Sequence, residues 1–176
     1  MATNPLTEVP NSTARNSKVS KPKWPGAKAP RPSLERRRGS ADTAPTVVFV
    51  EDCDSDFELA CIGIEQVTPN VRAQRVATGR DFMDYMAGRI TPVALFILDL
   101  NLPDTSGLVL AQRLRQSPSN AATPIVIFSS STNPRDAEAA KRSGADEYHV
   151  KPVVPDEFLR VVERIASRWL PQTQYV

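Results

Sequence analysis

Four apolar runs in this sequence each precede a polar residue that phosphoryl-transfer chemistry can use. The run VVFV leads to Glu51 and Asp52, FIL to Asp99, PIVIF to Ser129 and YHV to Lys151. If these runs are parallel strands of an open α/β sheet, their carboxyl ends lie along one edge, where such folds build their binding sites. Three carboxylates, a hydroxyl and an ammonium are therefore expected to meet at one site.

Asp99 is the candidate nucleophile, because a carboxylate at a strand end can attack a phosphoryl group and form an aspartyl phosphate. The transfer needs its negative charge neutralised, and the neighbouring acidic pair offers hard oxygen ligands for Mg²⁺. We expect Asp52 to bind the ion directly, Glu51 to act through water and the backbone carbonyl of Asn101 to complete the protein's share. The predicted metal site thus comprises Glu51, Asp52, Asp99 and Asn101.

Lys151 and Ser129 are expected to stabilise the charge of the transferred group. Lys151 would contact one phosphoryl oxygen and pair with Asp99 in the resting state, while Ser129 would donate a hydrogen bond to another oxygen. Each feature alone has an ordinary structural explanation: an acidic pair favours a helix N-terminus, and serine at a strand end forms turns. The combination is what indicates a site.

The elements that must position these residues alternate from Thr46 onward, as in repeated βαβ units. Strands are expected near 46–51, 71–77, 94–99, 124–129 and 145–151, and helices near 55–67, 79–88, 107–117, 134–143 and 157–169. Right-handed crossovers then place helices on both faces of a five-stranded parallel sheet, the α/β flavodoxin-like doubly wound fold. The acidic stretch EDCDSD after the first strand disfavours a dinucleotide-binding Rossmann enzyme, which needs a glycine-rich loop there.

The charge distribution divides the chain. Residues 1–45 carry nine Lys/Arg against three Asp/Glu and hold seven of the sixteen prolines, whereas residues 46–176 carry thirteen against seventeen. We expect 1–45 to be a disordered, basic, proline-rich tail, 46–170 to be one domain and 171–176 to be a short C-terminal tail. The run Arg36-Arg37-Arg38 could contact nucleic acid, an acidic membrane or an acidic partner, or be simply solvated.

Membrane, secretion and disulfide signals are not found in the sequence. No apolar stretch approaches the roughly 18 residues of a membrane span, and the N-terminus does not follow a signal-peptide pattern, so we expect a cytoplasmic protein without a membrane span. Cys53 and Cys61 have no second Cys/His pair to complete a zinc site, and two reduced thiols are the expectation.

Four segments together resemble the receiver domain of two-component response regulators, over about 46–170. They are VVFVEDCDSD, FILDLNLPDTSG, PIVIFSSS and GADEYHVKP, with Pro103 and Gly107 at the spacing that the family shows after its aspartate. The resemblance implies Mg²⁺-dependent phosphorylation of Asp99 by a sensor histidine kinase or phosphotransfer protein. Ser129 would then move toward the phosphoryl group and Tyr148 would rotate inward. Such a protein is not a classical enzyme but catalyses its own phosphorylation and dephosphorylation.

The resemblance also implies how a signal leaves the domain. The output face would be 134–168, contacting a downstream protein target or a second copy in a homodimer, and His149 would belong to it. A direct DNA-binding domain is not expected, and kinases would dock near the first helix. The sequence is similar in EDCDSD and DLNLP to stand-alone regulators paired with phytochromes. The family further implies a cis Lys151–Pro152 bond, and Asn101 and Ser131 hold positions that tune the lifetime of the acyl phosphate.

Two other functions stay open on the sequence. A phosphatase using Asp99 as nucleophile, as in haloacid-dehalogenase-like enzymes, would have a second acid two residues later, where this chain has Asn101. A receiver-like binding module that no longer responds to phosphate would be indifferent to Mg²⁺ and phosphodonor, although Asp99 and Lys151 argue against it. A receiver predicts a stoichiometric acyl phosphate, whereas a phosphatase predicts turnover of phosphate esters.

Overall fold

Five parallel strands form one sheet in the order β2-β1-β3-β4-β5. The computed structural model describes residues 44–89 and 91–171. The strands are β1 (Thr46–Val50), β2 (Arg72–Val76), β3 (Val93–Leu98), β4 (Ile125–Ser129) and β5 (Glu147–Val150). Because the chain runs from β1 outward to β2 and then returns to β3 on the other side, the topological switch point lies between β1 and β3.

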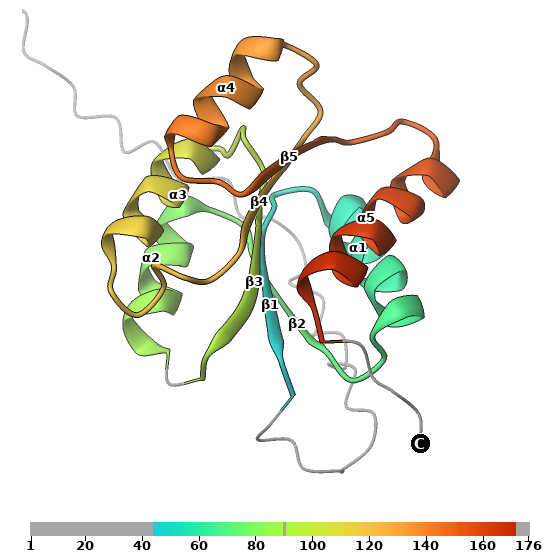
Figure 1. Ribbon diagram of the computed structural model, residues 1–176, viewed down its shortest axis with the longest axis horizontal. Coiled ribbons are helices and arrows are strands. Elements are labelled where there is room, and N and C mark those ends of the chain that lie inside the picture. Colours follow the sequence, from blue (N-terminus) through green and yellow to red (C-terminus); the bar gives the residue numbers. More distant parts are fainter. Residues whose placement is uncertain (1–43, 90, 172–176) are drawn as a thin grey trace, which may run out of the picture. The chain divides into compact units, whose positions relative to one another are not determined.

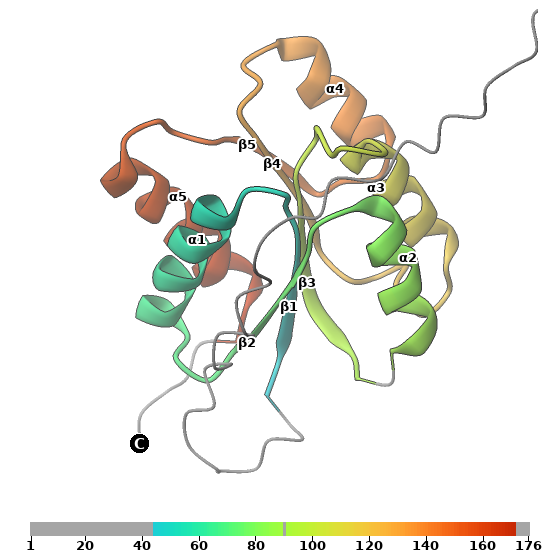
Figure 2. The same ribbon diagram turned by 180° about the vertical axis from the view of Figure 1, so that it is seen from behind.

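Five helices alternate with these strands and cover both faces of the sheet. They are α1 (Asp54–Val67), α2 (Gly79–Gly88), α3 (Gly107–Gln116), α4 (Pro134–Arg142) and α5 (Pro155–Trp169). Helices α1 and α5 lie on one face, and α2, α3 and α4 lie on the other (Figures 1 and 2). No helix within the described residues is long and apolar enough to cross a membrane.

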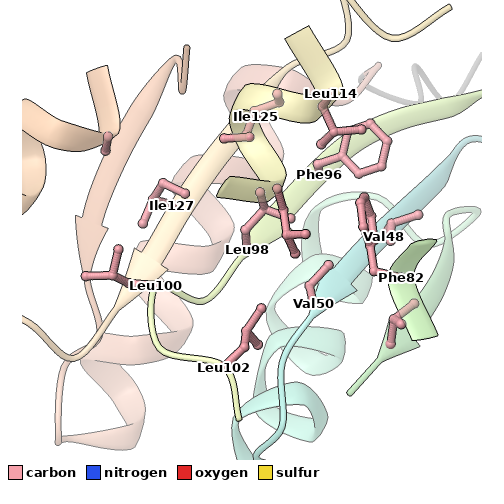
Figure 3. Packing of buried hydrophobic residues seen from close by; sticks show 14 of the residues in the cluster. Val48, Val50, Phe82, Phe96, Leu98, Leu100, Leu102, Leu114, Ile125 and Ile127 are labelled. Atoms are coloured by element: carbon pink, nitrogen blue, oxygen red, sulfur yellow. The ribbon is translucent and has the colours of Figure 1, made fainter. Parts of the chain in front are cut away.

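Each face of the sheet has its own hydrophobic core, because both faces of a parallel sheet are covered and strand side chains alternate between them. Val48, Val50, Phe96 and Leu98 point toward α2 and α3, where they meet Phe82 and Leu114 (Figure 3). The neighbouring strand residues point toward α1 and α5 and form the second core: Val47, Phe49, Leu95, Ile97, Val126, Phe128, Phe158, Val162 and Ile165.

The observed architecture confirms the predicted fold class. Helix α2 has the predicted bounds, and the other elements begin or end within a few residues of them, with the largest shift at β5, which is shorter at both ends. The predicted tail 1–45 lies outside the described residues except for its last two, as does 172–176 at the other end.

One expectation from the family resemblance is wrong in this structure. All peptide bonds among the described residues are trans, including Lys151–Pro152. An X–Pro bond favours trans by only about 0.5–1 kcal/mol, so local contacts decide between the two forms. With the trans bond, Lys151 still reaches the carboxylates at the strand ends, with its ammonium 2.7 Å from Asp99 Oδ2.

Candidate functional site

The acidic residues stand at the ends of the two strands that flank the switch point. Glu51 directly follows β1 and Asp99 directly follows β3. The backbone amide of Asp99 donates to the carbonyl of Val50, so the sheet ladder itself sets the spacing of the two carboxylates. Glu51 and Asp99 are buried, whereas Asp52 is exposed at the rim.

Lys151 links these carboxylates from the end of β5. Its ammonium donates to Glu51 Oε2 at 2.6 Å and to Asp99 Oδ2 at 2.7 Å, as the sequence predicted for Asp99. The lysine side chain is only 7% exposed and lies against the face of the Phe128 ring. An ammonium withdrawn this far from water needs more than one negative partner to offset its lost hydration.

A further carboxylate, Asp56, completes this group. Its Oδ2 lies 3.0 Å from Lys151 Nζ, although the sequence interpretation assigned it no role. Asp56 sits in the first turn of α1, which begins right after the acidic strand end. The feature of the sequence that could have indicated Asp56 was its position at a predicted helix N-terminus, next to the carboxyl edge of the sheet. Acidic residues are favoured at helix N-termini for structural reasons alone, so this feature did not point to a site.

The pKa values of the ion pair shift with burial and with charge. Burial raises the pKa of the Glu51 carboxyl, and this exceeds the opposing effect of its hydrogen bond from Lys151. Burial alone would lower the pKa of Lys151, but hydrogen bonds to Asp99 and Glu51 outweigh it and raise that pKa above its usual value. The two carboxylates therefore favour the charged form of Lys151.

The carboxylates of Glu51, Asp52 and Asp99 each offer an oxygen within 4.8 Å of the others, a separation that one hard divalent cation can bridge. Both Glu51 oxygens already accept hydrogen bonds, from the Cys53 amide and from Lys151, which suits a water-mediated contact. Asp52 is exposed and suits direct ligation. Asn101 follows two residues after Asp99, and its backbone N–H donates a hydrogen bond to Asp99 Oδ1 at 3.1 Å.

Ser129 and Tyr148 connect to each other through Ser131. Ser129 is fully buried at the end of β4, and its hydroxyl accepts a hydrogen bond from the Ser131 amide at 3.3 Å. The Tyr148 hydroxyl donates to the Ser131 carbonyl at 2.7 Å, and its ring is partly buried against the core. The Ser131 hydroxyl in turn donates to Asp136 in α4.

The loop after Asp99 is fixed by two neighbouring helices. A Cβ on Gly107, the first residue of α3, would lie 2.1 Å from the Asp99 carbonyl oxygen, so this position requires glycine. Asp104 accepts hydrogen bonds from the amides of Gly79 and Arg80 at the start of α2, and these lower the pKa of its carboxyl. These contacts tie the loop to the first residues of both helices.

The remaining sequence candidates lie away from the carboxylates or carry ordinary contacts. His149 Nε2 lies 2.7 Å from Glu147 on the same strand, and Glu147 also pairs with Arg168 of α5. Cys53 and Cys61 are free thiols, and burial raises the pKa of the Cys61 thiol to about 11.

The comparisons with known proteins agree with this geometry. A family profile described as the response regulator receiver domain matches residues 47–163. The chain is 27% identical over 129 residues to the probable methanogenesis regulatory protein FilR2 of Methanothrix harundinacea, covering 70% of this chain and 83% of that protein. It is 32% identical over 129 residues to response regulator RppA of Synechocystis, covering 72% of this chain but only 53% of that protein. It spans 30% of another relative, the cyclic di-GMP phosphodiesterase response regulator RpfG of Xanthomonas campestris.

Solved structures share the fold. The phosphorylated cyanobacterial phytochrome response regulator RcpA matches with a TM-score of 0.67 at 23% identity, covering 76% of this chain and 97% of that one. The Mn²⁺-bound form of response regulator Rcp1 matches with a TM-score of 0.66 at 23% identity, covering 75% and 97%. Response regulator RPA3017 in red light signaling of R. palustris matches with a TM-score of 0.63 at 25% identity, covering 72% and 94%.

The sheet order, the acidic edge with its lysine and the profile match over most of the described residues lead to one conclusion. This chain belongs to the response regulator receiver domain family of two-component signalling.

Proposed function

We propose that this protein accepts a phosphoryl group on Asp99 from a sensor histidine kinase or a phosphotransfer protein in the cytoplasm, through a receiver domain spanning 46–170. The observation that carries the proposal is the buried Lys151 ammonium, held 2.7 Å from Asp99 beside carboxylates that can share one cation. Of the proteins that share the fold, RcpA was solved phosphorylated and Rcp1 with Mn²⁺, which supports the same chemistry here.

In the proposed step, an Asp99 carboxylate oxygen attacks the phosphorus of a phosphohistidine. An O–P bond forms, the P–N bond breaks and the imidazole leaves with the electron pair. A Mg²⁺ ion held by Asp52 and Asp99, and through water by Glu51, would supply charge neutralisation and in-line orientation. Lys151 offers a second cation for the phosphoryl oxygens, and Ser129 offers a hydroxyl donor.

The proposed signal leaves through the contacts of Ser131. Because Ser129 accepts from the Ser131 amide and Tyr148 donates to the Ser131 carbonyl, a shift of Ser129 toward a phosphoryl oxygen would strain both hydrogen bonds. Ser131 also contacts Asp136, so α4 and β5 would respond together. We propose that the 134–168 face then binds a downstream protein or a second copy of this chain.

The phosphorylation is tested with acetyl phosphate and Mg²⁺ followed by intact-mass measurement. We expect a gain of about 80 Da for one phosphoryl group, which is lost in Asp99→Asn and in the presence of EDTA. Turnover of phosphate esters without a stable adduct would instead favour a phosphatase. A protein that gains no mass and binds no Mg²⁺ would favour the phosphate-independent binding module.

The output path is tested by hydrogen exchange with and without phosphorylation. We expect exchange to change in 130–136 and 147–151, with no change in Asp99→Asn. Changes confined to the loop 100–106 would contradict a signal that reaches the 134–168 face.

A further inference from the structure

Arg75 on β2 contacts the acidic loop between β1 and α1, although it belongs to neither element. Its Nε donates to the Glu51 carbonyl at 2.8 Å, and its Nη2 donates to the Asp52 carbonyl at 2.7 Å. Two nitrogens of one planar guanidinium therefore bind the carbonyls of two successive residues. Both of these residues carry a carboxylate of the candidate cation site.

The rest of the guanidinium is also engaged. Nη1 forms an ion pair with Asp54 in the first turn of α1, and the group lies 5.9 Å from the centre of the Phe57 ring. The Arg75 side chain is 23% exposed, so the protein covers most of it. The backbone of β2 next to Arg75 is also held in place, because the Glu51 amide donates to the Val76 carbonyl and continues the β1–β2 ladder.

These contacts determine where the carboxylates point. A carbonyl direction fixes the peptide plane, and two successive planes fix the backbone dihedrals of the residue between them. The planes of the Glu51 and Asp52 carbonyls flank Asp52, so Arg75 fixes the backbone of Asp52 and the direction in which its side chain leaves the chain. For Glu51, the contact of its carbonyl with Arg75 acts together with the hydrogen bond of its amide to the Val76 carbonyl. Without this restraint the loop would spread, because four acidic residues lie within six positions, 51–56.

We propose that Arg75 is a positioning residue for the divalent-cation site, which restrains the carbonyls of Glu51 and Asp52 so that their carboxylates stay within reach of one ion. The inference rests on the cation site of the proposed function. The planar fork of arginine is required, because the single ammonium of lysine cannot hold two carbonyls in fixed directions.

The direction in which cation affinity changes when Arg75 is replaced distinguishes this positioning role from an electrostatic one. A cation this close to the site repels a divalent ion, so removing its charge without disturbing the loop would tighten cation binding. Losing the restraint would instead weaken binding, and groups that orient metal ligands typically change affinity by about 10- to 100-fold. The proposal therefore predicts the direction opposite to that of charge removal alone.

The experiment measures Mn²⁺ binding to the full chain by electron paramagnetic resonance, with Mg²⁺ as competitor. Arg75→Gln removes charge and fork, Arg75→Lys keeps the charge, and Arg164→Gln removes the same charge from an exposed position on α5. We expect both Arg75 variants to bind Mn²⁺ about tenfold more weakly than the unsubstituted protein. Arg164→Gln should bind like the unsubstituted protein, and circular dichroism should show that each variant is folded.

Three results would overturn the inference: Arg75→Gln binds Mn²⁺ as tightly as the unsubstituted protein or more tightly, Arg75→Lys binds normally, or Asp54→Asn weakens binding as much as Arg75→Lys. The last variant removes the ion pair but leaves both carbonyl contacts, so it stays informative if Arg75→Gln does not fold. If the unsubstituted protein binds no Mn²⁺ and gains no phosphoryl group, the proposed function fails. If it does both while the Arg75 variants match it, only the role of Arg75 fails.

Discussion

The buried charge of Lys151 bears on the stability of the fold and, in the proposed function, on phosphoryl transfer. Its ammonium is shared among Glu51, Asp56 and Asp99 at 2.6–3.0 Å, and it occupies oxygens that a divalent cation would also use. The lysine and the cation therefore compete for the same negative charge. Removing the lysine leaves the buried carboxylates of Glu51 and Asp99 without a cationic partner, and buried unpaired charges are costly.

Replacing Lys151 by Gln should destabilise the metal-free protein by about 3 kcal/mol, because it leaves buried charges unpaired. The same change should strengthen Mg²⁺ binding, since the competing ammonium is gone. Thermal unfolding over a Mg²⁺ titration measures both effects, because the midpoint rises with site occupancy. Lys141→Gln on α4, which is exposed, is the matched control. Weaker Mg²⁺ binding in Lys151→Gln would show that the lysine does not compete with the ion.

At the scale of elements, α2 and α3 hold the loop that carries Asp99. Asp104 caps α2 from outside that helix, in addition to the local cap in which Thr78 accepts from the Asp81 amide. Gly107 lets α3 begin against the Asp99 backbone. Neither contact involves the carboxylates paired with Lys151, yet both restrain the loop that follows Asp99, the proposed phosphoacceptor.

Asp104→Asn should lower the stability of the fold at neutral pH and make that stability less sensitive to acidification. Amide hydrogen bonds keep the pKa of Asp104 below its usual 3.8 in the folded protein. A carboxyl whose pKa is lower in the folded than in the unfolded protein stabilises the fold when the pH is above its unfolded-state pKa. This stabilisation is lost as the pH falls through its folded-state pKa. The midpoint difference from the unsubstituted protein should therefore be largest near pH 7 and shrink below about pH 4. Asp84→Asn, an exposed change within α2, the helix that Asp104 caps, is the matched control.

Gly107→Ala should damage the site through the backbone. The new methyl would meet the Asp99 carbonyl oxygen at 2.1 Å, so α3 or the loop must move. We expect a loss of about 1–3 kcal/mol in unfolding free energy, comparable to other overpacked positions, and slower transfer from acetyl phosphate. Gly88→Ala is the control, because a Cβ there meets nothing within 4 Å. Equal stability and transfer rates for the two variants would mean that the close approach at Gly107 is unimportant.

At the scale of the molecule, all of the observed cores and the site lie within 47–170. The sheet joins residues distant in sequence, so that Lys151 and Glu51, one hundred positions apart, form a hydrogen bond. The profile match ends at residue 163, although Ile165, Ala166 and Leu170 of the last helix region still belong to the core.

Removing residues 1–43 should leave both stability and phosphorylation unchanged, because residues within 47–170 form both hydrophobic cores and the candidate cation site. The thermal midpoint and the rate of mass gain with acetyl phosphate should match those of the full chain. A slower rate or a lower midpoint in the shortened protein would show that the basic segment contributes to the domain, against the proposed boundary at residue 46.

The sequence alone determined the order and kind of the elements and the meeting of Glu51, Asp52, Asp99 and Lys151. It could do so because strand and helix periodicities are local, and because parallel strands bring their carboxyl ends to one edge. Only the tertiary structure decided which other charged side chains join that edge. In the sequence, Asp56, Arg75 and Asp104 look like solvated residues, since hydrophobic patterns carry no information about which polar groups meet. Likewise, the trans Lys151–Pro152 bond and the contact of Gly107 with Asp99 depend on atomic packing between elements that the chain pattern does not encode.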